Sequence, residues 1–339
     1  MTSPRDVVIV GGGPSGLATA IGTARAGLDY EVLEKGALVD SIFRFPRDMV
    51  FFTTPDLLEI GGLPFTTPYE KPTRVEALAY YRRVADAYRL RVSLGVRVDG
   101  IEAVPGRDRY FDVRGTGPDG RLEERRARTV VVAIGYYDQP NRLGVPGEDL
   151  PHVSHYYTEA HGFYRKRVVV VGGKNSAAEA ALDLRRAGAH VTLVHRREAL
   201  GESIKYWVRP NIENRIKEGA IAARFGTCVL EIRPDAVVVE GPAGREELPA
   251  AGVFLLTGYH PDRELLEGAG VRVDAATCKP GHDSETLETN VPGLYLAGAV
   301  VSGNETNRIF IENGRFHGEK VAEAIRRRLR EPSETSVPV

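Results

Sequence analysis

Residues 7–20 read VVIVGGGPSGLATA, and this stretch decides the fold. Four apolar residues precede the glycines, as in a buried strand, and the residues after the glycines predict a helix. Gly11, Gly13 and Gly16 fit the pattern G-x-G-x-x-G. The first glycine permits a tight turn, the second lets backbone approach a pyrophosphate, and the third lets the helix pack close to the strand. The stretch therefore predicts a dinucleotide-binding turn.

The residue that ends the next predicted strand supports this interpretation. Glu34 ends the predicted strand in DYEVLEKG and lies 18 residues after Gly16. A carboxylate at this place can accept hydrogen bonds from a ribose, while the pyrophosphate lies at the helix N-terminus. The alternative, a merely structural turn, leaves the acid unexplained.

A second copy of the same unit begins near residue 165. Its strand, turn and helix read RKRVVVVGGK and NSAAEAALDLRRAG, followed by the strand HVTLV and by HRRE at 195–198. Gly172 and Ala177 take the first and third fingerprint positions, but Lys174 replaces the second glycine. That side chain hinders the closest backbone approach, and its charge can compensate at the phosphates.

Arg196 and Arg197 stand where the first copy has Glu34. An acid there favours a free ribose 2′-hydroxyl, whereas arginines suit a 2′-phosphate and hence NADPH. The alternative is that both are solvated arginines at a strand end. Two dissimilar dinucleotide sites in one chain indicate a resident cofactor and a visiting one, the division of labour between a flavin and a nicotinamide.

The two copies predict an α/β protein with two Rossmann-like dinucleotide-binding domains, the domain of the second copy being inserted in that of the first. We expect the first domain to cover 1–148 and 258–330, the second 149–257, and a flexible tail 331–339. Alternating residues between the copies, around the turn GTGPDGR, predict a β meander. A last helix is expected from about Phe310.

Composition excludes several classes of function. The 339 residues carry a net charge of −1, so no overall positive potential would attract nucleic acid or an acidic membrane. No apolar run approaches the ~20 residues of a membrane span. Two cysteines make no disulfide framework, so we expect a cytoplasmic protein. His152 and His155 lack further ligands nearby, and we expect no metal site.

The chain resembles the thioredoxin-reductase-like flavoproteins through VVIVGGGPSGL with Glu34, VVAIGYYDQP, VVVVGGKNSA with HRRE, and NVPGLYLAG. Longer strings narrow the resemblance to the bacillithiol-disulfide reductase (YpdA-type) family. They include SIFRFPRDMVFFTTPDLLEIG, GYYDQPNRLGVPGEDLPHVSHYYTEAH, SIKYWVRP and NRIFIENGRFHG. The resemblance implies an NADPH-dependent, FAD-containing reductase of an oxidised low-molecular-weight thiol.

The resemblance also implies two sets of cofactor-binding residues. The FAD set is Gly11, Gly13, Pro14, Ser15, Gly16, Glu34, Lys35, Ser41, Ile42, Phe52, Thr53, Gly135, Gly298, Phe310 and Ile311. The NADPH set is Gly172, Lys174, Asn175, Ser176, Ala177, Arg196 and Arg197. Many relatives have Asp after the glycine that corresponds to Gly298; Ala299 stands here.

The thiol of the family is missing from its expected place. Thioredoxin reductases need a C-x-x-C pair, which this chain lacks, and the bacillithiol family carries a cysteine where Ser15 stands. Without a dedicated base, a serine performs no disulfide exchange. We expect Cys228 to be a buried core residue and Cys278 to be exposed, neither with a catalytic role.

The catalytic residue and the electron acceptor therefore stay open. Reduced flavin can pass its electrons directly to a small-molecule disulfide, or the acceptor can be a ferredoxin, a flavodoxin or a quinone. A third alternative is a redox sensor that binds both nucleotides and turns nothing over. By analogy with relatives we expect a homo-oligomer.

Overall fold

The computed structural model describes residues 3–106 and 110–330 and divides into two compact units. The first takes the described residues within Met1–Phe43, Val50–Gln139 and Tyr259–Val339, and the second takes Arg44–Met49 and Pro140–Gly258. The sequence predicts domain boundaries at 148/149 and 257/258, whereas the units divide after Gln139 and after Gly258. The predicted tail, 331–339, lies outside the described residues.

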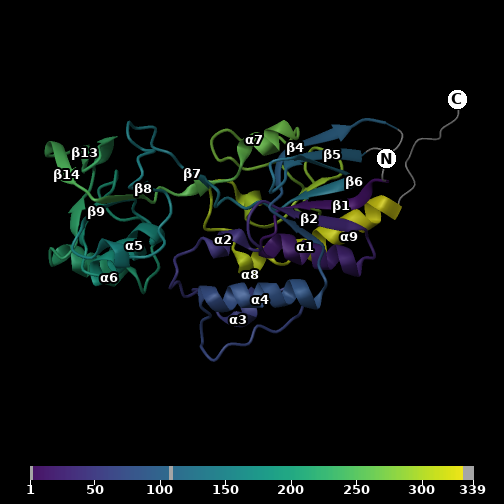
Figure 1. Ribbon diagram of the computed structural model, residues 1–339, viewed down its shortest axis with the longest axis horizontal. Coiled ribbons are helices and arrows are strands. Elements are labelled where there is room, and N and C mark those ends of the chain that lie inside the picture. The colour runs from purple at the N-terminus through teal and green to yellow at the C-terminus, as the bar shows by residue number, and fades with distance from the viewer. Residues whose placement is uncertain (1–2, 107–109, 331–339) are drawn as a thin grey trace. The chain divides into compact units, whose positions relative to one another are not determined.

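A seven-stranded sheet forms the centre of the first unit, in the order β3-β2-β1-β6-β5-β4 with β17 also beside β6 (Figure 1). The strands are β1 (Arg5–Val10), β2 (Tyr30–Glu34), β3 (Val92–Leu94), β4 (Arg97–Val104), β5 (Tyr110–Thr116), β6 (Leu122–Val132) and β17 (Leu294–Leu296). The strands β1, β2, β3 and β17 are parallel to their neighbours; β4, β5 and β6 pair antiparallel with one another, and β6 is parallel to β1 and β17. The predicted meander is confirmed.

The strand β6 joins the meander to the nucleotide-binding part of the sheet. It is one continuous strand of eleven residues. Its first half pairs with β5, and its second half, Ala127 to Val132, pairs with β1. The alternation in LEERRA therefore belongs to the same strand as the apolar run TVVV, which is buried on both faces.

Helices cover the sheet of the first unit. They are α1 (Pro14–Arg25), α2 (Asp40–Phe43), α3 (Pro55–Leu58), α4 (Arg74–Ala87), α7 (Arg263–Gly268), α8 (Ile311–Gly314) and α9 (His317–Arg330), with the 3-10 turn η2 at Gly298–Ser302. Figure 1 shows α1 and α9 side by side. They pack closely because a Cβ on Gly22 would lie 2.9 Å from the Gly318 carbonyl oxygen.

The second unit repeats the nucleotide-binding topology with a five-stranded parallel sheet, β11-β10-β9-β15-β8. Its strands are β8 (Val153–Ser154), β9 (Arg167–Val171), β10 (His190–Val194), β11 (Ala222–Arg224) and β15 (Gly252–Leu255). The helices α5 (Asn175–Arg186) and α6 (Arg209–Lys217) contact each other, and η1 covers His161–Phe163. A three-stranded antiparallel sheet joins β12 (Cys228–Ile232), β13 (Ala236–Gly241) and β14 (Gly244–Pro249).

Two short strands pair where the chain passes between the units, β7 (Gln139–Pro140) and β16 (Tyr259–His260). The segment Arg44–Met49, which is far from the rest of the second unit in sequence, is also part of that unit. The Arg47 backbone N–H donates to the Thr158 carbonyl at 2.8 Å, and the Arg47 guanidinium lies 3.1 Å from the Glu159 carboxylate.

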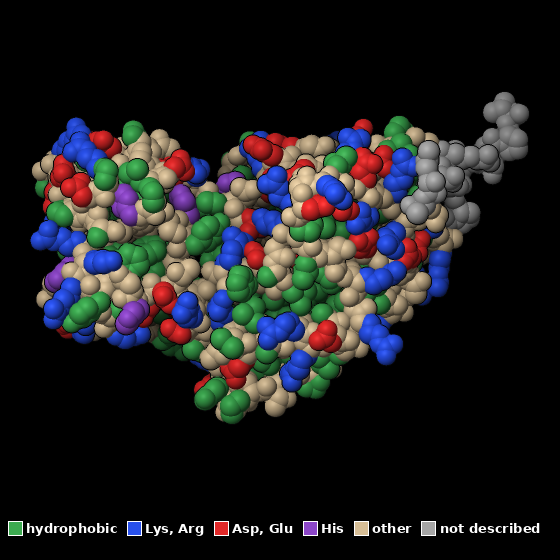
Figure 2. All heavy atoms as spheres, in the orientation of Figure 1, with side chains coloured by type: hydrophobic (Ala, Val, Ile, Leu, Met, Phe, Trp, Pro, Cys, Tyr) green, Lys and Arg blue, Asp and Glu red, His purple; other side chains and the backbone are tan. Residues whose placement is uncertain are grey.

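Each unit has its own hydrophobic core. In the first unit, Val8, Ile9, Val130 and Leu294 are fully buried; in the second, Val170 and Leu193 are. On the face shown in Figure 2, basic and acidic side chains are mixed, which agrees with the net charge of −1. Among the described residues, no helix is both long enough and apolar enough to cross a membrane.

Candidate functional site: two glycine turns

The first glycine turn has no room for side chains at two of its glycines. Gly11 has a φ of +109°, and a Cβ there would lie 2.5 Å from the Ala133 carbonyl oxygen at the end of β6. A Cβ on Gly16 would lie 1.9 Å from the Gly11 carbonyl oxygen. Backbone therefore packs on backbone, and α1 begins directly against the ends of β1 and β6.

Gly13 is different, because a Cβ there would meet no heavy atom within 4 Å. It is the N-cap of α1, no side chain caps the helix, and Pro14 occupies the first turn. An α-helix leaves its first N–H groups without intrahelical partners, and these groups bind anions. Open space at Gly13 beside an uncapped helix fits a cofactor pyrophosphate.

Glu34 is buried at the end of β2 and holds the turn. Its carboxylate accepts hydrogen bonds from the Gly12 N–H at 2.6 Å and from the Gly36 N–H at 2.8 Å. Burial raises the pKa of Glu34, and these two hydrogen bonds oppose the rise. A carboxylate has about four lone-pair sites, so acceptor capacity remains for a ribose. The neighbouring Lys35 forms an ion pair with Asp138 at 2.8 Å.

Ser15 lies in the first turn of α1 and faces two more glycines. Its Oγ would be 2.5 Å from a Cβ on Gly298 and 3.2 Å from a Cβ on Gly314. Gly298, with a φ of +79°, donates its N–H to Nδ1 of His317 at 3.0 Å. Among the described residues, the Ser15 hydroxyl makes no hydrogen bond to an acid or a base, so nothing there activates it as a nucleophile.

His317 is neutral at physiological pH. Burial lowers its pKa to about 4, and the charges of Lys320 and His282 contribute. Because Nδ1 accepts the Gly298 hydrogen bond, the ring proton is assigned to Nε2. Sequence reasoning missed His317, although it belongs to the string NRIFIENGRFHG that carries the resemblance.

The other residues predicted for FAD lie in loops and short helices of the first unit. Ser41 and Ile42 belong to α2, which the Val39 N–H joins to the Gly12 carbonyl at 3.1 Å. Gly135, with a φ of +64°, follows β6. Phe52 and Thr53 are half-buried in the loop before α3. The backbone N–H of their neighbour Phe51 donates to the Pro72 carbonyl at 2.9 Å.

The predicted helix from Phe310 is interrupted. The helix α8 contains only Ile311–Gly314, and α9 begins at His317. Between them, Arg315 turns aside and donates to the carbonyls of Asp56 at 2.6 Å and Glu59 at 2.9 Å. A helix therefore begins at Ile311, close to the expected start, but it ends after one turn and the longer helix α9 follows it.

The second glycine turn, in the second unit, has the same backbone packing. A Cβ on Gly172 would lie 2.6 Å from the Leu256 carbonyl oxygen and 2.8 Å from the Cβ of Ala177. Lys174 is the N-cap residue of α5, with no side-chain cap, and its side chain is exposed, as is that of Ser176. The uncapped helix and the exposed lysine fit an anionic ligand.

Asn175 does not point its amide into open space. Its Oδ1 accepts the Lys205 N–H at 2.9 Å, and its Nδ2 donates to the Ser203 carbonyl at 3.0 Å. The Gly201 N–H also donates to the Gly173 carbonyl at 2.7 Å. Asn175 therefore holds the loop 201–208 against the glycine turn, a role that sequence reasoning missed.

Arg196 and Arg197 follow β10 directly and are exposed. Among the described residues, neither guanidinium takes part in an ion pair. The preceding residue, His195, has its pKa lowered by burial and by the charges of Arg197 and Arg196. A Cβ on Gly173 would meet the His195 ring at 2.3 Å. The His195 ring thus packs against the turn, while the guanidinium groups of Arg196 and Arg197 are exposed and could bind a phosphate.

The cysteines differ from expectation in one respect. Cys228 is exposed because it begins β12, an edge strand of the three-stranded sheet, so the expectation of a buried core residue is wrong. Cys278 is partly exposed. His155 lies 3.3 Å from the buried Glu148 carboxylate. Within the described ranges, no cluster of His, Cys, Asp and Glu side chains could hold a metal ion.

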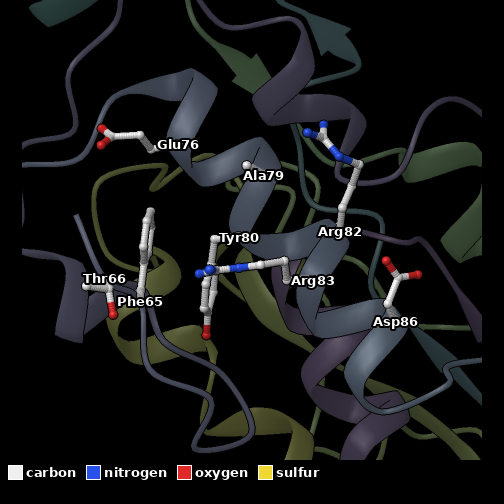
Figure 3. Close-up of a pocket in the computed structure, with 8 residues that line it drawn as sticks. All are labelled: Phe65, Thr66, Glu76, Ala79, Tyr80, Arg82, Arg83 and Asp86. Atoms are coloured by element: carbon white, nitrogen blue, oxygen red, sulfur yellow. The ribbon is translucent and has the colours of Figure 1, made fainter.

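A pocket of about 360 Å³ lies on the first unit beside α4. Figure 3 shows the rings of Phe65 and Tyr80 next to each other, and the rings stack 4.4 Å apart. Arg82, Arg83 and Asp86 of α4 also line the pocket, so both signs of charge are present. None of the residues that line the pocket belongs to the predicted nucleotide sites.

Known proteins are similar to this chain in sequence and in fold. A family model described as pyridine nucleotide-disulphide oxidoreductase matches residues 8–298. Bacilliredoxin reductase Bdr of Bacillus subtilis (strain 168) is 42% identical over 324 residues, 95% of this chain and 97% of that protein.

Two solved structures are bacillithiol disulfide reductases Bdr (YpdA). The Bacillus cereus protein has a TM-score of 0.93 and 40% identity, over 96% of this chain and 100% of that one. The Staphylococcus aureus protein has a TM-score of 0.90 and 37% identity, over 96% and 99%. The predicted resemblance, fold class and oxidoreductase class are confirmed. The chain belongs to the pyridine nucleotide-disulphide oxidoreductase family.

Proposed function

We propose that this protein is an FAD- and NADPH-dependent reductase of a low-molecular-weight disulfide of the bacillithiol type, and that it works without a thiol at position 15. The overall reaction is NADPH + H⁺ + RSSR → NADP⁺ + 2 RSH, in which NADPH is oxidised and the disulfide gains two electrons and two protons. Enzymes of this family use FAD as the resident carrier between the two substrates.

One observation carries the proposal: the chain has two glycine turns, one in each unit, and the charged side chains beside them differ in sign. The first pairs an uncapped helix and the open Gly13 with the buried Glu34. This arrangement fits a pyrophosphate and a ribose with free hydroxyls, as in FAD. The residues of the FAD set that meet at this turn are Gly11, Gly13, Ser15, Gly16, Glu34 and Gly298.

The second turn presents three exposed cations instead, Lys174, Arg196 and Arg197. Guanidinium groups bind phosphate bidentately, and an ammonium binds it as a point charge. We assign the pyrophosphate to the turn with Lys174, and the 2′-phosphate to the two arginines.

Ser15 takes no chemical role in this proposal. Among the described residues its hydroxyl makes no hydrogen bond to a base, and it lies in a narrow space between Gly298 and Gly314. We propose that it donates a hydrogen bond to the bound cofactor, as a small residue in the first turn of a helix. The disulfide then meets the reduced cofactor directly.

Flavin reoxidation tests the acceptor. Purified protein is reduced anaerobically with NADPH, bacillithiol disulfide is added, and flavin absorbance is followed by stopped flow. We expect rapid reoxidation, together with release of two thiols per NADPH consumed. Bacilliredoxin carrying bacillithiol in mixed disulfide is the second substrate to try, since the B. subtilis relative is named for that protein.

The missing thiol favours one alternative, reduction of another acceptor such as a ferredoxin, a flavodoxin or a quinone. Reoxidation by one of these, with none by either disulfide, would replace the proposed substrate and keep the proposed cofactors. Failure of all of them would favour a sensor. A homo-oligomer and a cytoplasmic location stay predictions.

A further inference from the structure

The loop 201–208 carries an exposed aromatic pair, Tyr206 and Trp207. The Tyr206 side chain is 82% exposed and that of Trp207 is 42% exposed. Their rings meet edge to face with centroids 4.8 Å apart, and the Lys205 ammonium lies 5.8 Å from the Trp207 centroid. Large, partly exposed aromatic groups on a loop held by hydrogen bonds are typical of binding surfaces.

The loop is fixed to the second glycine turn rather than free. The Gly201 N–H donates to the Gly173 carbonyl. The Asn175 side chain donates to the Ser203 carbonyl and accepts the Lys205 N–H. Arg209, the first residue of α6, donates to the Gly201 carbonyl at 2.6 Å. The aromatic pair therefore keeps a set distance from the turn to which we assign a pyrophosphate.

The loop also continues directly from the two arginines assigned to the 2′-phosphate. The chain runs from β10 through Arg196 and Arg197 into the loop and then into α6, which packs on α5. In a Rossmann unit, the end of the second strand meets the adenosine ribose. This order of segments would put the loop, including Lys205, beside the adenosine half of a dinucleotide bound at the turn.

We propose that Trp207, supported by Tyr206 and Lys205, forms a stacking platform for the adenine of NADPH. This inference rests on the proposed function and names residues that recognise the base rather than its phosphates. Stacking on an aromatic ring is favourable for any purine, and the nearby cation adds attraction to the phosphates. Asn175 is a positioning residue in this arrangement, because it holds the platform through two hydrogen bonds.

Tryptophan fluorescence tests the proposal directly, because Trp207 is the one tryptophan of the chain. The FAD-loaded protein is excited at the red edge of indole absorption and titrated with 2′,5′-ADP, which carries the adenosine half alone. Nicotinamide mononucleotide, which carries the other half, is the comparison ligand. We expect saturable quenching by 2′,5′-ADP and none by the mononucleotide.

Substitutions separate stacking from a movement of the loop. Trp207→Leu should raise the Kd of 2′,5′-ADP, measured by calorimetry, about tenfold, while Trp207→Phe should restore most of the affinity. In stopped flow, the Leu variant should need more NADPH for half-maximal flavin reduction, with an unchanged limiting rate. Tyr164→Leu is the matched control, since Tyr164 is 56% exposed in the same unit but lies outside this loop.

The outcomes distinguish this inference from the proposed function. If NADPH reduces the flavin while Trp207→Leu binds 2′,5′-ADP as tightly as the wild type, adenine does not stack on Trp207, and the proposed reductase function is unaffected. Quenching by the mononucleotide alone would likewise overturn it. If NADPH neither reduces the flavin nor competes with 2′,5′-ADP, the proposed function fails first.

Discussion

Ser15 and Gly298 pack closely against each other in the first unit. Gly298 has a φ of +79°, which costs a residue with a side chain roughly 1–2 kcal/mol. A Cβ there would also lie 2.5 Å from the Ser15 Oγ and 2.7 Å from the Ser15 Cβ. The two positions are therefore coupled, and a substitution at one changes what the other accepts.

Gly298→Ala should accordingly lower the melting temperature, through both the backbone strain and the contact with Ser15. Ser15→Gly removes the contact but not the strain, so the double variant should recover part of the loss. A double-mutant cycle by thermal denaturation measures this coupling. Strictly additive effects of the two substitutions would contradict the geometry.

His317 gives the first unit a pH dependence. Its pKa is lowered from 6.5 to about 4, so between these values the unfolded chain binds more protons than the folded one. The stability that His317 contributes is present above pH 6.5 and is lost as the pH falls toward 4.

Because the ring is only partly buried, screening limits the loss to about 1 kcal/mol between pH 7.5 and pH 5. His317→Gln keeps an acceptor for the Gly298 N–H without titrating. Urea unfolding at the two pH values should show a smaller loss in the variant; an equal loss would assign the effect to another group.

Arg196 and Arg197 should determine which nicotinamide nucleotide is preferred. A hydrogen bond to a charged group contributes about 1.5–3 kcal/mol, so Arg196→Ala or Arg197→Ala should weaken the binding of NADPH roughly 10- to 100-fold. NADH lacks the 2′-phosphate, so its binding should change little. The ratio of kcat/KM for the two nucleotides measures this, with Arg185→Ala, at the other end of α5, as the control. An unchanged ratio would place both arginines outside the site.

At the scale of elements, the glycines of the first turn divide into two kinds. Gly16 packs on the Gly11 carbonyl, whereas Gly13 faces open space with an ordinary φ of −73°. Gly16→Ala should prevent α1 from docking and reduce the yield of folded protein. Gly13→Ala should leave the melting temperature of the FAD-free protein unchanged and lower its affinity for FAD.

Flavin content after gel filtration and melting curves of the FAD-free protein separate the two effects. Equal loss of stability in both variants would mean that Gly13 serves the fold rather than the cofactor.

The repeated pattern of strand, glycine turn and helix could be predicted from sequence because each part has a local cause. The apolar strand, the glycines and the helix stop at Gly27 or Gly188 lie close together in the chain. The break between α8 and α9 could not, because it depends on Arg315 reaching carbonyls of residues 56 and 59, about 250 positions earlier. The role of Asn175 likewise depends on Ser203 and Lys205.

The exposure of Cys228 was mispredicted for a related reason. Its sequence context, with apolar neighbours in CVLEI, is that of a buried strand. Only the strand order shows that β12 is at the edge of a three-stranded sheet. Local pattern identifies a strand, but not its place in a sheet.

At the scale of the whole molecule, the separate cores predict separate responses to ligands. FAD removal should increase hydrogen exchange in β1, α1 and α8 of the first unit and leave β9 and α5 of the second unit protected, because a ligand stabilises the region that binds it. Addition of 2′,5′-ADP should protect 172–177 and 196–209 only. Exchange mass spectrometry measures both; loss of protection throughout the chain on FAD removal would show that the units unfold together.

The segment Arg44–Met49 has a consequence for modular exchange of the units. A gene fragment that encodes Pro140–Gly258 alone omits these six residues, among them Arg47, which hydrogen-bonds to the Thr158 carbonyl and pairs with Glu159. A chimaera that takes its second unit from a relative must therefore transplant two stretches of sequence, one of which lies within the first unit's part of the chain. Recombination with a single pair of breakpoints would give the transplanted unit without its own segment corresponding to Arg44–Met49.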